Sequence, residues 1–277
     1  MKEGNRWVLV TGASTGIGRG ITEYLAAHGF NVYACVRKEP DLENLSQIAN
    51  VKAIKLDVTS DDDVEKAVEV VKKANTGLFG LVNNAGIAVA GALLDLTGKD
   101  MLDQFEVNFF GVHRVTRSFF PLLLASKGRI VMMSSDSGFF ATPFTGAYCA
   151  SKHAIEGYAD SLRRELALVG MNVAIIEPGR IKTEIWQKSL YALDKFKDTM
   201  FGKVGCKLGA DEIKKGSGKG LPPEAVAKKV YAALVAKNPR IRYPVPDKPL
   251  EFKLTKTLPA RWVDKMVAKV LKKYVEQ

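Results

Sequence analysis

A short β-rich run followed at once by glycines constrains this fold more than any other part of the chain. Residues 6–11 read Arg-Trp-Val-Leu-Val-Thr, and residues 12–20 read Gly-Ala-Ser-Thr-Gly-Ile-Gly-Arg-Gly. Glycines let the backbone approach a phosphate closely, and the free N–H groups of a following helix favour its charge. The spacing Gly-x-x-x-Gly-x-Gly departs from the Gly-x-Gly-x-x-Gly of many dinucleotide loops. The pattern predicts a strand, a phosphate loop and a helix, with a ligand-free turn as the alternative.

The rest of the pattern indicates how the chain is organised around this loop. Strand and helix patterns alternate from residue 7 to residue 177, and residues 8–10, 80–82 and 129–133 are short apolar runs typical of strands buried on both faces. The length of 277 residues and the 47% hydrophobic content suit one α/β domain. We therefore expect a single domain over residues 1–277 with a doubly wound, Rossmann-like parallel sheet and a ligand at the carboxyl ends of its strands.

The next two strands bear on the choice of cofactor. The run 31–36 ends in Arg37 and Lys38, where an acidic residue would bind the ribose of NAD and an arginine accommodates the 2′-phosphate of NADP. We therefore favour NADP(H), with NAD(H) as the alternative, although two basic residues would also suit a solvated surface. Asp57, after the run 51–56, is placed to bind an adenine or to precede the next helix.

Tyr148 and Lys152 lie four residues apart in a run of good helix formers. One helix face then carries both side chains, about 5–6 Å apart at Cβ. An ammonium close to a phenol lowers the phenol pKa, which an acid/base catalyst working near neutrality requires. Ser135 precedes them by a loop and can bring a hydroxyl to the same carbonyl oxygen. The set suits alcohol/carbonyl interconversion, whereas Tyr148 and Lys152 alone would also fit an ordinary exposed pair.

Several motifs occur in register from residue 6 to about residue 185. They are Thr11-Gly12-x-x-x-Gly16-x-Gly18, Asn83-Asn84-Ala85-Gly86, Asn108, Ser135, Tyr148-x-x-x-Lys152 and Pro178-Gly179. In this order and spacing the chain resembles the short-chain dehydrogenases/reductases. The segments 32–38 and 239–245 resemble the hydroxysteroid and retinol dehydrogenase branch of that family.

The resemblance implies roles for individual residues. Tyr148 would be the general acid/base, Lys152 would lower its pKa and hold the nicotinamide ribose, Ser135 would orient the substrate carbonyl and Asn108 would support a proton-relay water. Thr183 would bind the nicotinamide carboxamide. No metal is expected. The implied cofactor-binding residues are Gly12, Ser14, Thr15, Gly16, Ile17, Gly18, Arg37, Lys38, Asp57, Val58, Asn84, Ala85, Gly86, Tyr148, Lys152, Pro178, Gly179, Ile181 and Thr183.

These residues predict an oxidoreductase that transfers a hydride between NADP(H) and a hydrophobic carbonyl or secondary alcohol, which is steroid-, retinoid- or acyl-like. The alternative is a non-catalytic NAD(P)-binding redox sensor. Because none of the four catalytic positions is substituted, we favour the enzyme. The resemblance also implies a homodimer or homotetramer.

The positive charge of the chain lies in its last third. The net charge is +11, with 20 Lys/Arg against 21 Asp/Glu in residues 1–185 and 21 against 9 in residues 186–277. Residues 186–221 mix aromatic and aliphatic residues with lysines and are predicted to form the substrate lid. A small hydrophobic substrate with an acidic group would suit them, and a solvated basic face is the alternative.

Residues 250–277 are predicted to form a basic amphipathic helix. Docking on its own domain is the default, and a partner subunit or peripheral contact with an anionic membrane are the alternatives. Nucleic-acid binding is discounted because no motif for it accompanies the charge. We expect a cytoplasmic protein that is at most peripherally membrane-associated. The chain has three scattered cysteines, and it shows no signal segment and no apolar run that would span a bilayer.

Overall fold

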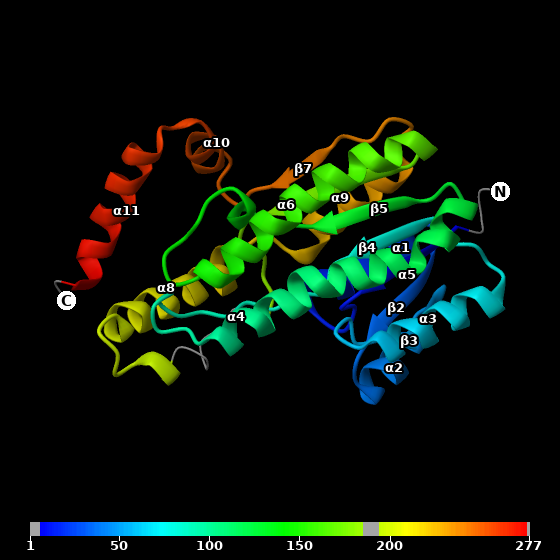
Figure 1. The fold of residues 1–277 in the computed structure, drawn as a ribbon, viewed down its shortest axis with the longest axis horizontal. Coiled ribbons are helices and arrows are strands. Elements are labelled where there is room, and N and C mark those ends of the chain that lie inside the picture. The colour runs from blue at the N-terminus through cyan, green and yellow to red at the C-terminus, as the bar shows by residue number, and fades with distance from the viewer. Residues whose placement is uncertain (1–5, 185–193, 276–277) are drawn as a thin grey trace.

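The computed structural model describes residues 6–184 and 194–275 of the chain. Seven parallel strands form one sheet in the order β3-β2-β1-β4-β5-β6-β7 (Figure 1). The chain runs outward from β1 to β3 and then returns to build the other half from β4 onward, so the order reverses between β1 and β4. The doubly wound parallel sheet is confirmed. Its strands are β1 (Trp7–Thr11), β2 (Asn31–Val36), β3 (Val51–Lys55), β4 (Gly80–Asn83), β5 (Arg129–Met133), β6 (Asn172–Pro178) and β7 (Arg242–Val245).

Helices cover both faces of the sheet, which is why its inner strands are largely apolar; the edge strand β3 carries the exposed Lys52 and Lys55. In β1, Val8 and Val10 pack into one buried cluster and Leu9 into the other. The first cluster includes side chains of α1 and α9, and the second includes side chains of α3, α5 and α6. The helices are α1 (Gly16–Ala27), α2 (Glu39–Ser46), α3 (Asp61–Ala74), α4 (Gly98–Phe105), α5 (Gly111–Ala125), α6 (Gly146–Leu166), α8 (Gly202–Lys219), α9 (Pro223–Val235), α10 (Pro249–Thr257) and α11 (Ala260–Val275).

Local sequence explains where the elements that hold the site begin. Ser60 caps α3 by accepting a hydrogen bond from the backbone N–H of Asp63, and three aspartates occupy the first turn of that helix, where the helix dipole favours them. A π-helical turn, Glu106–Phe110, joins α4 to α5 and contains Asn108. Such turns occur frequently at functional sites because they re-aim a side chain within a continuous helix.

The segment that was predicted to be the substrate lid lies at the carboxyl edge of the sheet. Its described part begins at residue 194 and contains α8; residues 186–193 of the prediction lie outside the described residues. Several α8 side chains line the cavity described below.

The C-terminal segment forms two helices, where one was expected over residues 250–277. The break between α10 and α11 follows from Pro259, because a proline disfavours helical backbone in the residue before it, and Leu258 is extended (φ −74°, ψ 145°). Both helices lie at one edge of the molecule, with α11 beside α8 (Figure 1). Among residues 6–184 and 194–275, no helix is both long and apolar enough to cross a membrane.

Candidate active site

A cavity of about 420 Å³ lies at the carboxyl ends of the strands. The loops after β1, β4, β5 and β6 meet there, and the start of α6 and one face of α8 complete it. It is lined by every predicted cofactor-binding residue except Lys38, and by three of the four predicted catalytic residues, Ser135, Tyr148 and Lys152. Asn108 does not line it and is buried behind it. The sequence motifs therefore converge on one place, at the point where the strand order reverses.

The glycine loop is shaped so that the backbone can approach a ligand. Gly12 and Gly16 have φ of +65° and +56°, a conformation that L side chains rarely adopt. A Cβ at Gly12 would lie 2.8 Å from the Cα of Ala85, and a Cβ at Gly18 would collide with the carbonyl oxygen of Gly12. At the start of α1, Thr15 makes no side-chain cap, so its hydroxyl does not satisfy the first helical N–H groups. This cradle fits a pyrophosphate.

Hydrogen bonds fasten the loop after β4 to the glycine loop. The Thr11 hydroxyl accepts bonds from the backbone N–H groups of Asn84 and Ala85, both at 3.0 Å. The Asn84 side-chain amide donates to the carbonyl oxygens of Thr11 at 2.9 Å and Gly12 at 3.2 Å. Asn84 thus has a structural role that holds both loops in register, in addition to lining the cavity.

The adenosine end of the cavity carries the groups expected to select the cofactor. The Arg37 side chain is 64% exposed, and its Nη1 lies 3.8 Å from Oδ2 of Asp57. Asp57 also accepts bonds from the N–H and hydroxyl of Thr59, so it shapes the turn into α3 as well as lining the cavity. Arg37 is therefore held beside the cavity mouth, whereas Lys38 is the N-cap residue of α2 and is exposed.

Asn108 is fully occupied by protein groups. Its Oδ1 accepts a bond from the N–H of Ile87 at 2.9 Å, and its Nδ2 donates to the carbonyl of Ile87 and to Oγ of Ser151, both at 3.0 Å. Ser151 in turn donates to the carbonyl of Tyr148 at 2.7 Å. Asn108 therefore fixes the loop after β4 against the helix that carries Tyr148 and Lys152.

The Lys152 ammonium is held near the ring of Tyr148 by a backbone carbonyl of the sheet. Its Nζ donates to the carbonyl oxygen of Met133 at 2.7 Å and lies 5.6 Å from the centroid of the Tyr148 ring. Burial lowers the pKa of Lys152 to about 8, against the opposing charge of Glu156. Burial also raises the pKa of Tyr148, and the neighbouring Ser135 hydroxyl lowers it. Tyr148 is thus protonated at neutral pH and ready to donate a proton.

Ser135 has a neighbour that the sequence analysis overlooked. Its hydroxyl donates to Oδ1 of Asp136 at 2.9 Å and accepts from the N–H of Ser137 at 3.2 Å. Burial raises the pKa of Asp136, whose carboxyl lines the cavity, and its charge raises the pKa of Tyr148. The signal was available, because a carboxylate directly after a predicted catalytic serine is rarely far from the same site.

The far wall of the cavity is joined to the sheet by an arginine that the sequence analysis also overlooked. Arg180, in the loop after β6, contacts Oε2 of Glu212 on α8 at 2.7 Å and Oδ2 of Asp247 at 3.2 Å. The residues of α8 that line the cavity are Gly205, Leu208, Gly209 and Glu212. No lysine of the described part of residues 186–221 lines the cavity. Arg180 lines it and contacts the α8 wall through Glu212.

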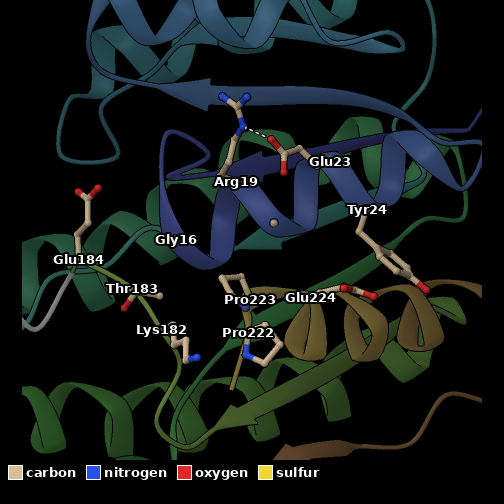
Figure 2. Close-up of a pocket in the computed structure, with 11 residues that line it drawn as sticks. Gly16, Arg19, Glu23, Tyr24, Lys182, Thr183, Glu184, Pro222, Pro223 and Glu224 are labelled. Carbon is tan, nitrogen blue, oxygen red and sulfur yellow. Dashed lines mark hydrogen bonds and ion pairs between the residues drawn. The ribbon is translucent and has the colours of Figure 1, made fainter. Parts of the chain in front are cut away.

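A second depression lies on the other side of the glycine loop (Figure 2). It runs between α1 and the start of α9, shares Gly16, Thr183 and Glu184 with the cavity, and contains none of the catalytic residues. Figure 2 shows Arg19 and Glu23 paired along its wall. It is larger, about 720 Å³, but it is open to solvent and contains none of Ser135, Tyr148 and Lys152.

Comparison with known proteins identifies the class. The family model for short chain dehydrogenases matches residues 6–193, and the chain belongs to that family. It is an oxidoreductase of alcohol and carbonyl groups.

Two relatives and one solved structure illustrate the similarity. The NADPH-dependent 3-dehydrocapnine reductase of Ornithobacterium rhinotracheale is 40% identical over 98% of this chain and 99% of its own. Human retinol dehydrogenase 16 is 39% identical over 68% of this chain and 60% of its own. A short-chain dehydrogenase from Streptomyces avermitilis superimposes with a TM-score of 0.78 at 26% identity, over 98% of this chain and 97% of its own.

Proposed function

We propose that the protein is an NADPH-dependent reductase of a hydrophobic ketone. The observation that carries the proposal is the convergence of Ser135, Tyr148 and Lys152 on one cavity whose other wall, on α8, presents Gly205, Leu208 and Gly209. The 3-dehydrocapnine reductase, which matches this chain nearly end to end, supports the direction and the cofactor. The intact catalytic residues and this relative favour an enzyme over the redox sensor.

Each of the residues at the site has a separate role in the reaction. A bound reduced nicotinamide supplies the hydride. Ser135 orients the substrate carbonyl, and the Tyr148 hydroxyl, protonated because burial raises its pKa, donates a proton to the carbonyl oxygen as negative charge develops there. Lys152, whose ammonium the Met133 carbonyl holds near the tyrosine ring, stabilises the phenolate that this transfer leaves behind. Asn108 holds the tyrosine helix in place through Ser151.

The substrate class is deduced from the walls of the cavity. Leu208 and Ile181 are buried apolar residues that line it, which suits an alkyl chain. An acidic group on the substrate would form an ion pair with Arg180. This ion pair would replace the one that Arg180 makes with Glu212. We propose a small hydrophobic ketone with an acidic group near the lid, handled by a homodimer or homotetramer in the cytoplasm.

The test is NADPH oxidation across a panel of ketones. Purified protein is assayed at 340 nm with neutral and acidic long-chain ketones, steroids and retinoids, with NADH in parallel. Turnover of a long-chain ketone with NADPH supports the proposal. Tight NADPH binding with no turnover on any ketone of the panel, in either direction, contradicts it.

A further inference from the structure

The helix α11 has one face docked on the protein and one face exposed. Val263, Val267 and Leu271 are half-buried on the side of α8, and the Tyr274 hydroxyl donates to Oδ2 of Asp211 on α8 at 2.7 Å. In Figure 1, α11 lies at the edge of the molecule, away from the sheet and beside α8. The helix is therefore anchored in place and presents its outer face to the surroundings.

The outer face carries large apolar side chains that nothing in the described structure covers. Trp262, Met266 and Val270 are 65%, 50% and 47% exposed. Their spacing of four residues places them in one row along the helix. We call this row the α11 ridge. Exposed apolar residues that occur singly need no explanation, but a continuous row on one helix indicates a surface that meets something else.

Unpaired positive charges flank the ridge. Arg261, Lys265, Lys269, Lys272 and Lys273 all lie on α11, against the single acid Asp264. In the described part of the chain, none of these five forms an ion pair. At 100° per residue, Lys265, Lys269 and Lys273 border the ridge on the side opposite to the docked face.

We infer that the α11 ridge docks on an anionic membrane surface, with the tryptophan and its neighbours in the headgroup region and the lysines at the lipid phosphates. Helices that lie in a membrane interface typically carry such a row of apolar residues, with lysines beside it whose long side chains reach outward. Tryptophan is suited to that depth because one end of its ring is apolar and the other is a hydrogen-bond donor.

A second copy of the chain is the less favourable occupant of this surface. A two-fold contact would bring the same patch of both subunits together. The five cations of one α11 would then face the five of its partner with only Asp264 to offset them. An anionic bilayer instead attracts every lysine and arginine that lies close to its surface.

Membrane docking would place the entrance of the active site close to the lipid. The helix on which α11 docks, α8, also lines the cavity through Leu208 and Glu212. A hydrophobic ketone dissolved in the bilayer would then have a short path to the cavity. This consequence rests on the proposed function, whereas the docking itself does not.

Vesicle flotation of the full chain with NADPH tests the inference. The vesicles are equimolar phosphatidylglycerol and phosphatidylcholine, and phosphatidylcholine alone. We expect flotation with the anionic vesicles that weakens as salt is raised. The triple variant Lys265→Glu, Lys269→Glu and Lys273→Glu should lower the partition coefficient by at least about 100-fold, since each charge is reversed. Trp262→Ser should lower it by about tenfold.

Matched control variants separate the ridge from general effects. Lys52→Glu, Lys73→Glu and Lys237→Glu together change the net charge by the same amount at other exposed positions, and Leu168→Ser removes an apolar side chain that is 90% exposed elsewhere. Both controls should keep at least half of the flotation, and circular dichroism confirms that every variant is folded.

Three results would overturn the inference. They are no flotation with anionic vesicles at low salt, equal flotation with neutral vesicles, or controls that lose as much as the ridge variants. The inference would also be overturned if the protein self-associates, Trp262→Ser abolishes the self-association and no vesicle binding occurs. That result would identify a second copy of the chain as the partner of the α11 ridge. Turnover of a water-soluble ketone without vesicles reports on the proposed function separately, because the ridge lies outside the active site.

Discussion

At the scale of single residues, the environment of Tyr148 raises the pKa of its hydroxyl and so keeps it protonated. Burial raises its pKa and so does the charge of Asp136, while only the Ser135 hydroxyl acts in the opposite direction. A protonated phenol is the form that a reductase needs. The reverse reaction starts from the phenolate, which the Lys152 ammonium would stabilise in the same way. The raised pKa of Tyr148 thus supplies the protonated form that reduction uses.

The first prediction concerns the proton donor. Tyr148→Phe removes one hydroxyl and keeps the ring, so NADPH affinity should change by less than about threefold while kcat falls by at least about 100-fold. Fluorescence titration gives the affinity and NADPH oxidation gives kcat. Tyr158→Phe on the same helix, whose hydroxyl contacts His113 outside the cavity, is the matched control. A Tyr148→Phe enzyme with the wild-type kcat would mean that another group donates the proton.

The second prediction concerns the pH profile. Lys152 must be charged to stabilise the phenolate, its pKa is about 8, and the Glu156 charge raises that pKa against burial. Since a lysine is charged below its pKa, activity should fall as the pH rises above about 8. Glu156→Gln removes the supporting charge, lowers the pKa of Lys152 further and should move this fall to lower pH.

The measurement is kcat against pH from 6 to 10 with NADPH saturating. Glu156 also contacts Arg242 at 2.9 Å, as does Asp160 at 3.1 Å one turn further along α6. Asp160→Asn therefore disturbs the same arginine without removing the charge nearest to Lys152, and its profile should match the wild type. Identical profiles for Glu156→Gln and the wild type would contradict the role assigned to Glu156.

The third prediction concerns cofactor choice. Arg37 is exposed beside the cavity and, among residues 6–184 and 194–275, its ion-pair partner is Asp57 alone, at 3.8 Å, so it is available to a 2′-phosphate. Arg37→Asp should reduce the preference for NADPH over NADH by about 10- to 100-fold, because a charge-assisted hydrogen bond contributes about 1.5–3 kcal/mol. Lys38→Asp should have a smaller effect because Lys38 does not line the cavity. Selectivity that is unchanged in Arg37→Asp would exclude this residue from cofactor choice.

At the scale of elements, α8 is held over the cavity by a contact between distant parts of the chain. Arg180 follows β6, Glu212 belongs to α8, and Asp247 follows β7. The arginine lies between two carboxylates, one of which belongs to α8. We expect a substrate carboxylate to compete with Glu212 for Arg180, which would link substrate charge to the position of α8.

The fourth prediction tests that link. Glu212→Gln frees the Arg180 charge toward the cavity and should raise kcat/KM for an acidic long-chain ketone, relative to its neutral ester, by about 5- to 20-fold. Asp211→Asn, its neighbour on the outer side of α8, contacts Tyr274 and should leave this ratio unchanged. An unchanged or lower ratio in Glu212→Gln would exclude Arg180 as the site of an acidic substrate group.

The limits of prediction from sequence are also clearest at this scale. Glycines, alternating apolar runs and the Tyr148–Lys152 spacing are local signals, so the fold and about half of the cavity lining could be predicted. The Arg180–Glu212 contact joins residues 32 positions apart, so no periodic pattern in the sequence indicates it. The direction of the Lys152 ammonium depends on a carbonyl of β5, which only the assembled sheet places there. The break before Pro259 was readable from the sequence, and the expectation of one long helix missed it.

At the scale of the whole molecule, the cavity is built from both halves of the sheet. The glycine loop follows β1, Asn84 follows β4 and Thr183 lies beyond β6, so a ligand in the cavity contacts loops from both sides of the point where the strand order reverses. A ligand that binds only the folded state stabilises it by about 2.7 kcal/mol at 100 times its Kd. Loops from both halves would share that stabilisation.

The fifth prediction follows from this arrangement. NADPH at about 100 times its Kd should raise the Tm by roughly 5–10 °C, given about 2–4 °C per kcal/mol for chains of this size. A Cβ added at Gly12 would lie 2.8 Å from the Cα of Ala85, and Gly12 has a positive φ. Gly12→Ala should therefore lower the Tm of the free protein and also abolish the NADPH-induced rise. Gly157→Ala, where a Cβ meets nothing within 4 Å, should keep the full rise. Differential scanning calorimetry measures both, and a Gly12→Ala protein that still gains the full rise would show that the cofactor binds away from this loop.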